Sequence, residues 1–354
     1  MKLLLPFGKL YGGILELRNR LYDRGILRVH DLGARTISIG NLTVGGTGKT
    51  PLVALTARIL AESGEKVCVL TRGYGRTDPK SRVLVSDWDN VLADAATGGD
   101  EPVELARILL GKAIVIADRD RVSAARWAKK GFGVTAFVLD DGFQHRKVRR
   151  DLDIVCIDAT NPCGNGHLLP AGILREPFKG LSRADAIVLT RSDLVDSPVD
   201  IVGRLKRRNE NAPVYLARQP IRKLVNLSEV TGKVLDDAEP GSESVVSDDA
   251  GPLFAFCGLG NPGSFRLQLD ANGFLVVGQR SFPDHHRYTT ADIRKIEQEA
   301  AAAGASGLVT TYKDAVKLEG LRFGIPVRVA IADAEIDNDA SFRGLLINGR
   351  KPGT

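Results

Sequence analysis

Short runs of mostly apolar residues alternate with amphipathic stretches through the middle of this 354-residue chain. The apolar runs are typical of buried strands and lie at 36–40, 66–70, 113–117, 136–139, 154–157 and 186–189. Stretches with helical spacing lie among them, at 50–62, 102–110 and 119–130. Short apolar strands separated by helices predict an α/β fold, with a parallel sheet covered by helices on both faces. Ligands bind such sheets at the carboxyl ends of the strands.

A second, smaller α/β domain is expected near the C-terminus, with strands at 253–257, 307–311 and 327–331 and a helix at 290–303. Before it, residues 233–250 are acidic and rich in Ser, Gly and Asp, which predicts a surface loop. We therefore expect an N-terminal segment, a larger α/β domain, linker strands with the acidic loop, and a C-terminal domain, at 1–35, 36–213, 214–251 and 252–354.

The N-terminal segment has its own pattern. Residues 1–35 carry seven Lys or Arg against three acids, which is four of the six net positive charges of the chain. Apolar residues recur there at helical spacing, at Leu3, Phe7, Leu10, Ile14, Leu17 and Leu21. A basic amphipathic helix of this kind lies on an anionic membrane surface; the alternative is a helix packed on its own domain. No nucleic acid is expected as a partner, because no aromatic platform or nucleic-acid motif accompanies the basic residues.

Composition excludes several other classes of protein. Hydrophobic residues make up 43% of the chain and charged residues 26%, which is typical of a folded globular protein and not of a disordered one. The four cysteines form no CxxC pair, so they argue against a disulfide scaffold or a zinc ribbon and indicate a reducing compartment. The longest run without Asp, Glu, Lys, Arg or His, 250–265, is shorter than the ~18 apolar residues that cross a bilayer.

The sequence TVGGTGKT at 43–50 follows the first predicted strand and opens the first predicted helix. Its glycines let backbone N–H groups surround phosphate oxygens, and the helix N-terminus adds its positive dipole. In such a loop Lys49 reaches the β- and γ-phosphates and the Thr50 hydroxyl ligates magnesium. Thr43 replaces the first glycine of the usual pattern, and a simple turn is the alternative. We predict a P-loop NTPase-like sheet that binds ATP and Mg²⁺ through Thr43, Val44, Gly45, Gly46, Thr47, Gly48, Lys49 and Thr50.

Paired acids end the apolar strand at 136–139, at Asp140 and Asp141. Carboxylates at the end of a strand that neighbours a phosphate loop are suited to organise magnesium. Taken alone, the same pair could serve as a helix cap or a turn. With Thr50 they are the candidate metal ligands.

Six motifs occur in order and together carry a resemblance to a known family. They are GNLTVGGTGKTP at 40–51, RGYGR at 72–76, GDEP at 99–102, DDGFQH at 140–145, LREP at 174–177 and FPDH at 282–285. This combination, which covers almost the whole chain, resembles the tetraacyldisaccharide 4′-kinases of lipid A biosynthesis. The resemblance implies transfer of the ATP γ-phosphoryl group to the 4′-hydroxyl of a tetraacylated glucosamine disaccharide 1-phosphate. The product is lipid IVA, made by a peripheral protein at the cytoplasmic face of a bacterial inner membrane.

The resemblance also implies roles for individual residues. Asp100 would accept the hydroxyl proton as a pair with His285, and Lys49 and Asp284 join them as catalytic candidates. The sequence alone favours a helix N-cap role for Asp100 and an ordinary surface or core histidine for His285, and only the resemblance assigns them to catalysis. Glu176 is a further candidate metal ligand, with an ion pair to Arg175 as the alternative. Candidates for contacts to substrate or phosphate are Arg72, Arg119, Arg121, Gln144 and His145.

Two features leave alternatives open. The sequence TRSD at 190–193 ends a strand and is similar to the base-binding element of GTP-binding proteins, with Arg191 where lysine is usual. A membrane-associated P-loop GTPase or ATPase switch is therefore the second hypothesis, and a soluble small-molecule kinase or ligase is the third. Tyr312 stands where the resembling family often has an acid, so no role is assigned to it.

Overall fold

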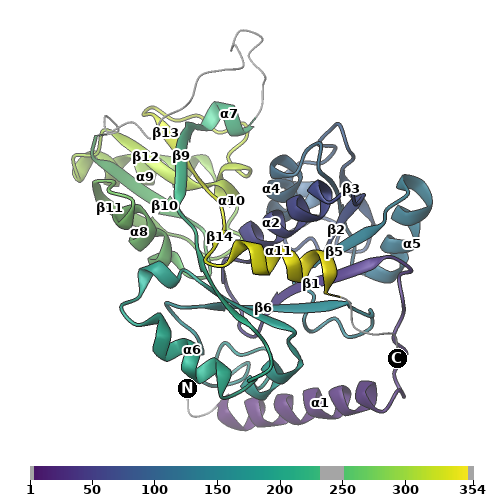
Figure 1. The fold of residues 1–354 in the computed structure, drawn as a ribbon. Helices are drawn as coiled ribbons and strands as arrows, with labels where there is room; N and C mark the ends of the chain where they lie inside the picture. The colour runs from purple at the N-terminus through teal and green to yellow at the C-terminus, as the bar shows by residue number, and fades with distance from the viewer. Residues whose placement is uncertain (1–3, 232–250, 350–354) are drawn as a thin grey trace.

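The computed structural model describes residues 4–231 and 251–349, whose strands form two sheets (Figure 1). The predicted loop at 233–250 lies outside the described residues. The larger sheet has the order β14-β8-β7-β6-β1-β5-β2-β4-β3 and the smaller one β11-β10-β12-β13-β9. The strands of the larger sheet are β1 (Arg35–Asn41), β2 (Val67–Thr71), β3 (Val83–Ser86), β4 (Ala113–Ala117), β5 (Ala136–Asp140), β6 (Leu152–Asp158), β7 (Ala186–Thr190), β8 (Val214–Arg218) and β14 (Glu335–Ile336). Those of the smaller sheet are β9 (Ile221–Asn226), β10 (Leu253–Cys257), β11 (Val276–Ser281), β12 (Gly307–Thr311) and β13 (Val327–Ala332).

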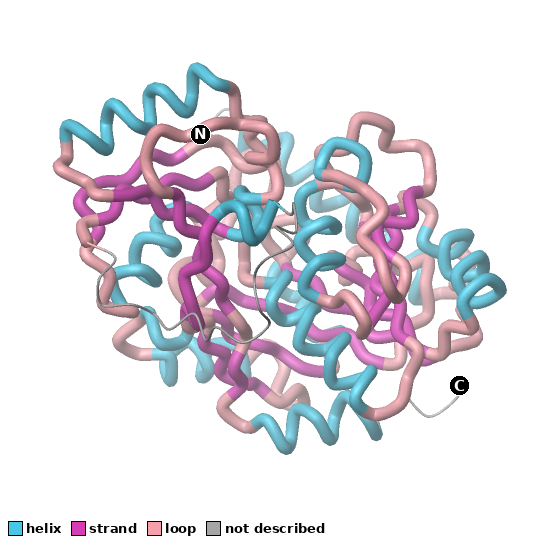
Figure 2. The backbone as a smooth tube through the Cα atoms, turned by 90° about the horizontal axis from the view of Figure 1, so that it is seen from above, coloured by secondary structure: helices cyan, strands magenta, loops and turns pink. Residues whose placement is uncertain are grey.

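The larger sheet is parallel apart from β3 and β14, which pair antiparallel at its two edges. Side chains that alternate along each strand pack against helices on opposite faces. Val67 and Val69 pack with α2 (Lys49–Glu62) and α4 (Asp100–Ile108), whereas Cys68 and Leu70 pack with α5 (Arg121–Phe132). Helix α6 (Pro198–Lys206) packs near β6 and β7. Figure 2 shows helices on both sides of the strands, which confirms the predicted architecture.

The smaller sheet is also covered on both faces. Phe265 and Leu269 of α8 (Pro262–Ala271) pack with Leu253 and Ala255, while α9 (Thr290–Ala302) packs with Phe254 and Phe256. The short helical segments are α3 (Ala95–Gly98), η2 (Phe178–Arg183), η3 (Ser192–Leu194), α7 (Leu227–Thr231) and α10 (Tyr312–Ala315).

The two sheets are not built from two consecutive segments. Strand β9, which lies in the predicted linker, pairs antiparallel with β13 of the smaller sheet. At the other end, β14 pairs with β8, and Phe342 and Leu346 of α11 (Asp339–Asn348) pack into the core that also contains α2. The chain therefore crosses between the sheets twice, and the domain limits drawn from sequence stay a prediction.

Helix α1 (Leu5–Asp23) forms as predicted and lies along the lower edge of the molecule in Figure 1. Gly8 and Gly12 face the protein: a Cβ atom on Gly8 would lie 3.2 Å from the Leu168 carbonyl oxygen, and one on Gly12 2.7 Å from Leu168 Cδ1. Its large apolar residues face outward, with Phe7, Leu10, Ile14 and Leu17 each at least 59% exposed. Leu3 lies outside the described residues. None of the described helices is both long and apolar enough to cross a bilayer.

The strands expected from sequence all occur, with ends that shift by one or two residues. Two helices begin two residues away from their expected starts. Helix α4 starts at Asp100, because Gly99 occupies the N-cap, and α5 starts at Arg121, because the Asp120 carboxylate accepts the N–H of Ser123. Strands β8 and β9 lie within the linker strands expected at 214–251. Strands β3, β11 and β14 and helices α6, α8 and α11 were not expected, because their mixed apolar and polar residues give no clear period.

Gly40 of β1 is a test of how closely the larger sheet packs. A Cβ atom there would lie 2.6 Å from Phe143 Cβ and 2.7 Å from the Phe143 backbone nitrogen. Gly40→Ala should therefore lower the free energy of unfolding by about 1–3 kcal/mol through overpacking. Gly131→Ala in α5 is the control, since its Cβ meets nothing within 4 Å and alanine favours a helix. Urea unfolding measures both; an unchanged midpoint for Gly40→Ala would contradict the packing.

Candidate active site

The glycine-rich loop at 43–48 connects β1 to α2, as the sequence predicted. Gly45 and Gly48 have φ of 102° and 72°, which favour glycine because a side chain is strained there. Gly48 is the N-cap of α2 and Lys49 its first residue, so the lysine and the free N–H groups of the first turn lie together. An anion at this helix end would meet the positive end of the helix dipole.

Side chains from outside the loop hold three of its carbonyl groups. Thr190 Oγ1 donates to the Thr47 oxygen at 2.8 Å, and Arg191 Nη1 donates to the Gly46 oxygen at 3.0 Å. Gln219 Nε2 donates to the Gly48 oxygen at 2.9 Å. Because C=O and N–H of a trans peptide point in opposite directions, this arrangement fixes where the neighbouring N–H groups point. We call Thr190, Arg191 and Gln219 the loop clamp.

The loop clamp continues into the smaller sheet. Arg191 pairs with Asp158 at the end of β6, and Asn261 Nδ2 donates to the same Asp158 oxygen at 3.0 Å. Asn261 belongs to the loop after β10, where a Cβ atom on Gly260 would lie only 2.5 Å from the Gly45 Cα. Thr190 and Arg191 of the TRSD sequence at 190–193, which is similar to a base-binding element, bind the phosphate loop. Gln219, Asp158 and Asn261 were missed, although Asp158 ends a predicted strand.

Asp140 and Asp141 lie at the end of β5 with opposite electrostatic surroundings. Asp140 is buried and accepts a hydrogen bond from Thr71 Oγ1 at 3.0 Å. Its burial, together with Glu101 and Asp141, raises the pKa of Asp140 to about 6. Burial would also raise the pKa of Asp141, but Lys49 and Arg175 outweigh it and lower that pKa to about 2. Arg175 lies 2.5 Å from the Asp141 carboxylate and Lys49 3.7 Å.

Glu176 lies deeper than the paired acids and has partners of its own. Its carboxylate accepts hydrogen bonds from Gln144 Nε2 and Arg183 Nη2, both at 2.8 Å. The alternative ion pair with Arg175 does not form, because Arg175 turns to Asp141. Within the residues that the structure describes, no group of three or more His, Cys, Asp or Glu is arranged to hold a metal. Mg²⁺ in phosphate sites is bound by one or two carboxylates plus phosphate oxygens. The metal role of Asp140, Asp141, Thr50 and Glu176 therefore stays a prediction.

A cavity of about 660 Å³, the active-site cavity, brings together most of the predicted residues. Helix α1 contributes Tyr11, Leu15 and Arg18 to its wall. The predicted residues that line it are Val44, Gly45, Lys49, Arg72, Arg119, Arg121, Asp140, Asp141, Gln144, His145, Asp284 and His285. The predicted residues that do not line it are Thr43, Gly46, Thr47, Gly48, Thr50, Asp100 and Glu176.

The basic side chains of this cavity differ in burial and in hydrogen-bond partners. Arg121 is buried beside Asp140, and burial lowers its pKa; its Nη2 donates to the Asp140 carbonyl at 3.4 Å. Arg72 donates to the Tyr74 hydroxyl at 2.6 Å. His145 is half-buried, and burial with the nearby Arg121 lowers its pKa to about 4, so its imidazole is neutral near pH 7. A concave surface with this density of arginine fits a phosphorylated ligand.

Asp100 and His285 meet although 185 positions separate them. His285 Nδ1 lies 2.9 Å from Asp100 Oδ2, and His285 has a φ of 61°. The hydrogen bond to Asp100 is the main cause that raises the pKa of His285. Burial alone would raise the pKa of Asp100, but His285 and Lys313 lower it to about 2. Lys313 also binds Glu101 at 2.7 Å and Asp284 at 2.9 Å.

The exposure of the two partners differs. Asp100 is 4% exposed and lines only a smaller cavity of about 200 Å³, whereas His285 lines both that cavity and the active-site cavity. The imidazole therefore separates Asp100 from the side where Lys49 lies. The N-cap alternative for Asp100 is excluded, because Gly99 is the N-cap of α4.

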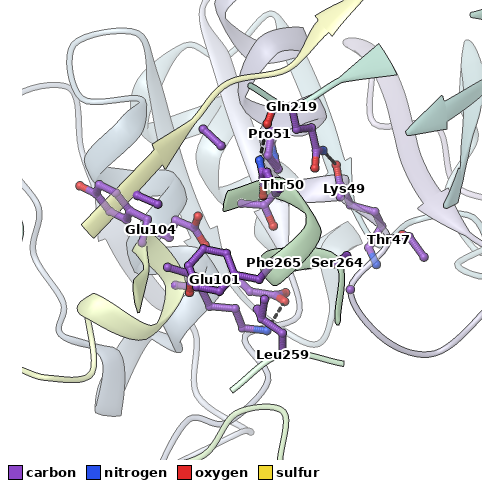
Figure 3. A pocket seen from close by; sticks show the side chains of 18 of the residues that line it. Thr47, Lys49, Thr50, Pro51, Glu101, Glu104, Gln219, Leu259, Ser264 and Phe265 are labelled. Carbon is purple, nitrogen blue, oxygen red and sulfur yellow. Dashed lines mark hydrogen bonds and ion pairs between the residues drawn. The ribbon is translucent and has the colours of Figure 1, made fainter. Parts of the chain in front are cut away.

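A second cavity lies on the other side of the phosphate loop (Figure 3). Thr50 and Pro51 of α2 meet Glu101 and Glu104 of α4 and Phe265 of α8 there. Burial, with Glu101 next, raises the pKa of Glu104 to about 8, so this carboxyl group is mostly protonated near pH 7. The loop thus has a cationic cavity on one side and a less polar one on the other.

Comparison with known proteins agrees with this geometry. Residues 1–348 match the model of the family described as LpxK: Tetraacyldisaccharide-1-P 4′-kinase. The tetraacyldisaccharide 4′-kinase of Anaeromyxobacter dehalogenans (strain 2CP-C) is 41% identical over 332 residues, which cover 90% of this chain and 82% of that protein. That of Desulfotalea psychrophila is 36% identical, covering 94% and 92%. A crystal structure of LpxK from Aquifex aeolicus in complex with ATP has a TM-score of 0.76 at 33% identity and covers 99% of both chains. The chain belongs to the tetraacyldisaccharide-1-phosphate 4′-kinase family.

Proposed function

We propose that this chain transfers the γ-phosphoryl group of ATP to the 4′-hydroxyl of a tetraacylated glucosamine disaccharide 1-phosphate, giving lipid IVA. The observation that carries the proposal is the His285–Asp100 pair, which reaches the active-site cavity opposite Lys49 and the phosphate loop. Family membership supports the lipid disaccharide as substrate, and the ATP in the Aquifex aeolicus structure supports ATP as donor. A GTPase switch is not favoured, because the match to the kinase family extends over residues 1–348.

The loop and the paired acids provide the site for the donor. Backbone N–H groups at 45–50 and Lys49 would bind the phosphates of ATP. Oxygen donors from Asp140, Asp141 and Thr50 suit a hard cation, and Mg²⁺ bound there would neutralise charge on the γ-phosphoryl group. Arg119 and Arg121 would bind the 1-phosphate of the acceptor or an ATP phosphate, because guanidinium groups pair with phosphate in two-point contacts.

The hydroxyl proton goes to the His285–Asp100 pair. Sequence similarity assigned the proton directly to Asp100, but its pKa of about 2 and its position behind the imidazole make His285 the nearer acceptor. His285 Nε2 takes the proton, while Nδ1–H remains bonded to Asp100, whose negative charge stabilises the imidazolium. Lys313 holds Asp284 and Glu101 beside the pair. This proton transfer can be late, because the transition state of phosphoryl transfer is loose.

We further propose that α1 lies on the anionic cytoplasmic face of the bacterial inner membrane. Its exposed Phe7, Leu10, Ile14 and Leu17 support this, with Lys9 and Arg20 exposed beside them. The opposite face of the same helix forms part of the active-site cavity through Tyr11, Leu15 and Arg18. A lipid at the membrane surface would then reach the catalytic residues without leaving the bilayer entirely.

The loop clamp predicts an effect on nucleotide binding. Arg191→Ala removes the donor to Gly46 and leaves the buried Asp158 carboxylate without its cation. Losing charged hydrogen bonds of about 1.5–3 kcal/mol should raise the KM for ATP about tenfold or more. Arg191→Lys should recover part of the lost affinity for ATP. The matched control is Arg266→Ala, which removes an exposed ion pair on α8. An unchanged KM for ATP in Arg191→Ala would mean that the clamp does not shape the loop.

The His285–Asp100 pair predicts a pH profile. If neutral His285 accepts the proton, kcat is low at acid pH and rises through an apparent pKa above 6.5, because Asp100 raises the pKa of the imidazole. Asp100→Asn should move this rise in kcat to lower pH and should lower kcat itself. His285→Asn should abolish the pH-dependent rise. Each single variant should lose roughly 10²–10⁴-fold in kcat with little change in the KM for ATP.

A double-mutant comparison completes this experiment. Two members of one unit are non-additive, so Asp100→Asn/His285→Asn should be little worse than the poorer single variant. Multiplicative losses, with both single variants folded, would show independent roles. Persistence of the acid limb in His285→Asn would assign proton acceptance to another group.

Substitutions on the outward face of α1 test whether this helix binds the membrane. Replacing Phe7, Leu10 and Leu17 by Ser should weaken sedimentation with anionic vesicles at least about tenfold, because each large apolar side chain contributes about 1.5–3 kcal/mol when fully buried. The inward face stays intact, so ATP binding should be unchanged. Leu275→Ser is the control, since Leu275 is 63% exposed on the smaller domain. Equal sedimentation of the α1 variant and the unaltered protein at low salt would refute the proposal.

A further inference from the structure

A third large cavity, of about 670 Å³, lies between α6 and the segment at 162–178. We call it the α6 cavity. Apolar side chains form its floor, among them Leu168, Phe178, Ile201 and Leu205. Protein interiors contain few voids larger than a water molecule, whereas small-molecule sites have volumes of roughly 300–1,000 Å³. Its size and lining are therefore those of a site for a ligand with an apolar part.

The remainder of the lining is cationic. Arg204, Arg207 and Arg208 border the α6 cavity, and no carboxylate is among the described residues that line it. These three side chains form no ion pair or hydrogen bond with any part of the chain that the structure describes. Three uncompensated guanidinium groups over an apolar floor suit an anionic amphiphile, since a wholly polar anion would leave the floor in water.

The α6 cavity lies beside the helix assigned to the membrane. Leu168 on its wall also meets α1, where a Cβ atom on Gly12 would lie 2.7 Å from Leu168 Cδ1. Lys179, which follows Phe178, pairs with Glu16 of α1 at 2.7 Å. In Figure 1, α1 and α6 lie at the same edge of the molecule. A bilayer against the exposed face of α1 would be close to the arginines of α6.

We propose that the α6 cavity binds an anionic phospholipid of the bilayer, with an acyl chain on the apolar floor and the phosphate on Arg204, Arg207 and Arg208. This inference rests on the proposed membrane position of α1. The substrate is a less suitable occupant, because no residue lines both the α6 cavity and the active-site cavity. The active-site cavity offers its own arginines, Arg119 and Arg121, for the single phosphate of the acceptor. The phospholipid therefore binds as a second lipid, which fixes the enzyme on the membrane beside its substrate.

Cys163 provides a direct measure of occupancy. It lines the α6 cavity and is partly exposed, whereas the other three cysteines, Cys68, Cys156 and Cys257, are buried. The rate at which an uncharged thiol reagent modifies Cys163 in the folded full-length chain should fall when lipid fills the cavity. Burial raises the pKa of this thiol, so the reaction is followed at alkaline pH. Cys163→Ser identifies the signal.

Three water-soluble probes separate the requirements for charge and chain. They are short-chain phosphatidylglycerol, phosphatidylcholine with the same chains, and glycerol phosphate, each added below micelle concentrations so that α1 has no bilayer to bind. At about ten times its Kd, phosphatidylglycerol leaves roughly a tenth of the cavity empty, so the modification rate should fall about tenfold. Phosphatidylcholine and glycerol phosphate should protect much less.

The variant Arg204→Ala/Arg207→Ala/Arg208→Ala should lose the protection while keeping kinase activity in detergent, because none of these residues lines the active-site cavity. Equal protection by phosphatidylcholine, or full protection of the arginine variant, would overturn the proposal. The proposal would also be overturned if the tetraacylated disaccharide, added in neutral detergent, protected Cys163 as well as phosphatidylglycerol does. The occupant would then be the substrate. Absence of kinase activity in the unaltered protein would refute the proposed function alone, because the thiol measurement does not depend on turnover.

Discussion

Hydrogen bonds to the carbonyl groups of the phosphate loop are the constraint on which the site depends. A loop with three glycines at 45, 46 and 48 has many accessible conformations, and ordering it costs more backbone entropy than ordering other residues. Thr190, Arg191 and Gln219 bond to three consecutive carbonyls and leave one arrangement of N–H groups. Because Asp158 accepts from both Arg191 and Asn261, the same network joins the loop to the smaller sheet.

Around this loop, charges are placed so that neighbouring carboxyl groups behave differently. Asp140 has its pKa raised to about 6 by burial and by nearby acids, whereas Lys49 and Arg175 keep Asp141 ionised with a pKa of about 2. Asp100 is equally buried but has His285 and Lys313 beside it, so its charge persists. Asp100 can therefore hold and polarise an imidazole, while Asp140 and Asp141 offer oxygen ligands beside the phosphates.

Helix α1 presents different residues to the active-site cavity and to the outside of the molecule. Gly8 and Gly12 allow the helix backbone to approach the segment at 168–171, and Tyr11 donates to the Arg175 carbonyl at 3.1 Å. Leu15 is buried on this side, whereas Phe7, Leu10, Ile14 and Leu17 are exposed. A helix with larger residues at positions 8 and 12 would lie farther from the active-site cavity.

Local pattern determined much of this protein. The apolar strands, the phosphate loop and the amphipathic α1 follow from residue spacing, because side-chain period and turn glycines act over a few positions. Six ordered motifs were enough to indicate the family. The tertiary structure decided how distant segments meet, although the family motifs had already implied the pair of Asp100 and His285. Asp100 and His285 meet across 185 positions, Glu176 takes Arg183 and Gln144 instead of its neighbour Arg175, and Gln219 closes the loop from a segment without a motif. Such pairings depend on how sheets and helices stack, which no local period encodes.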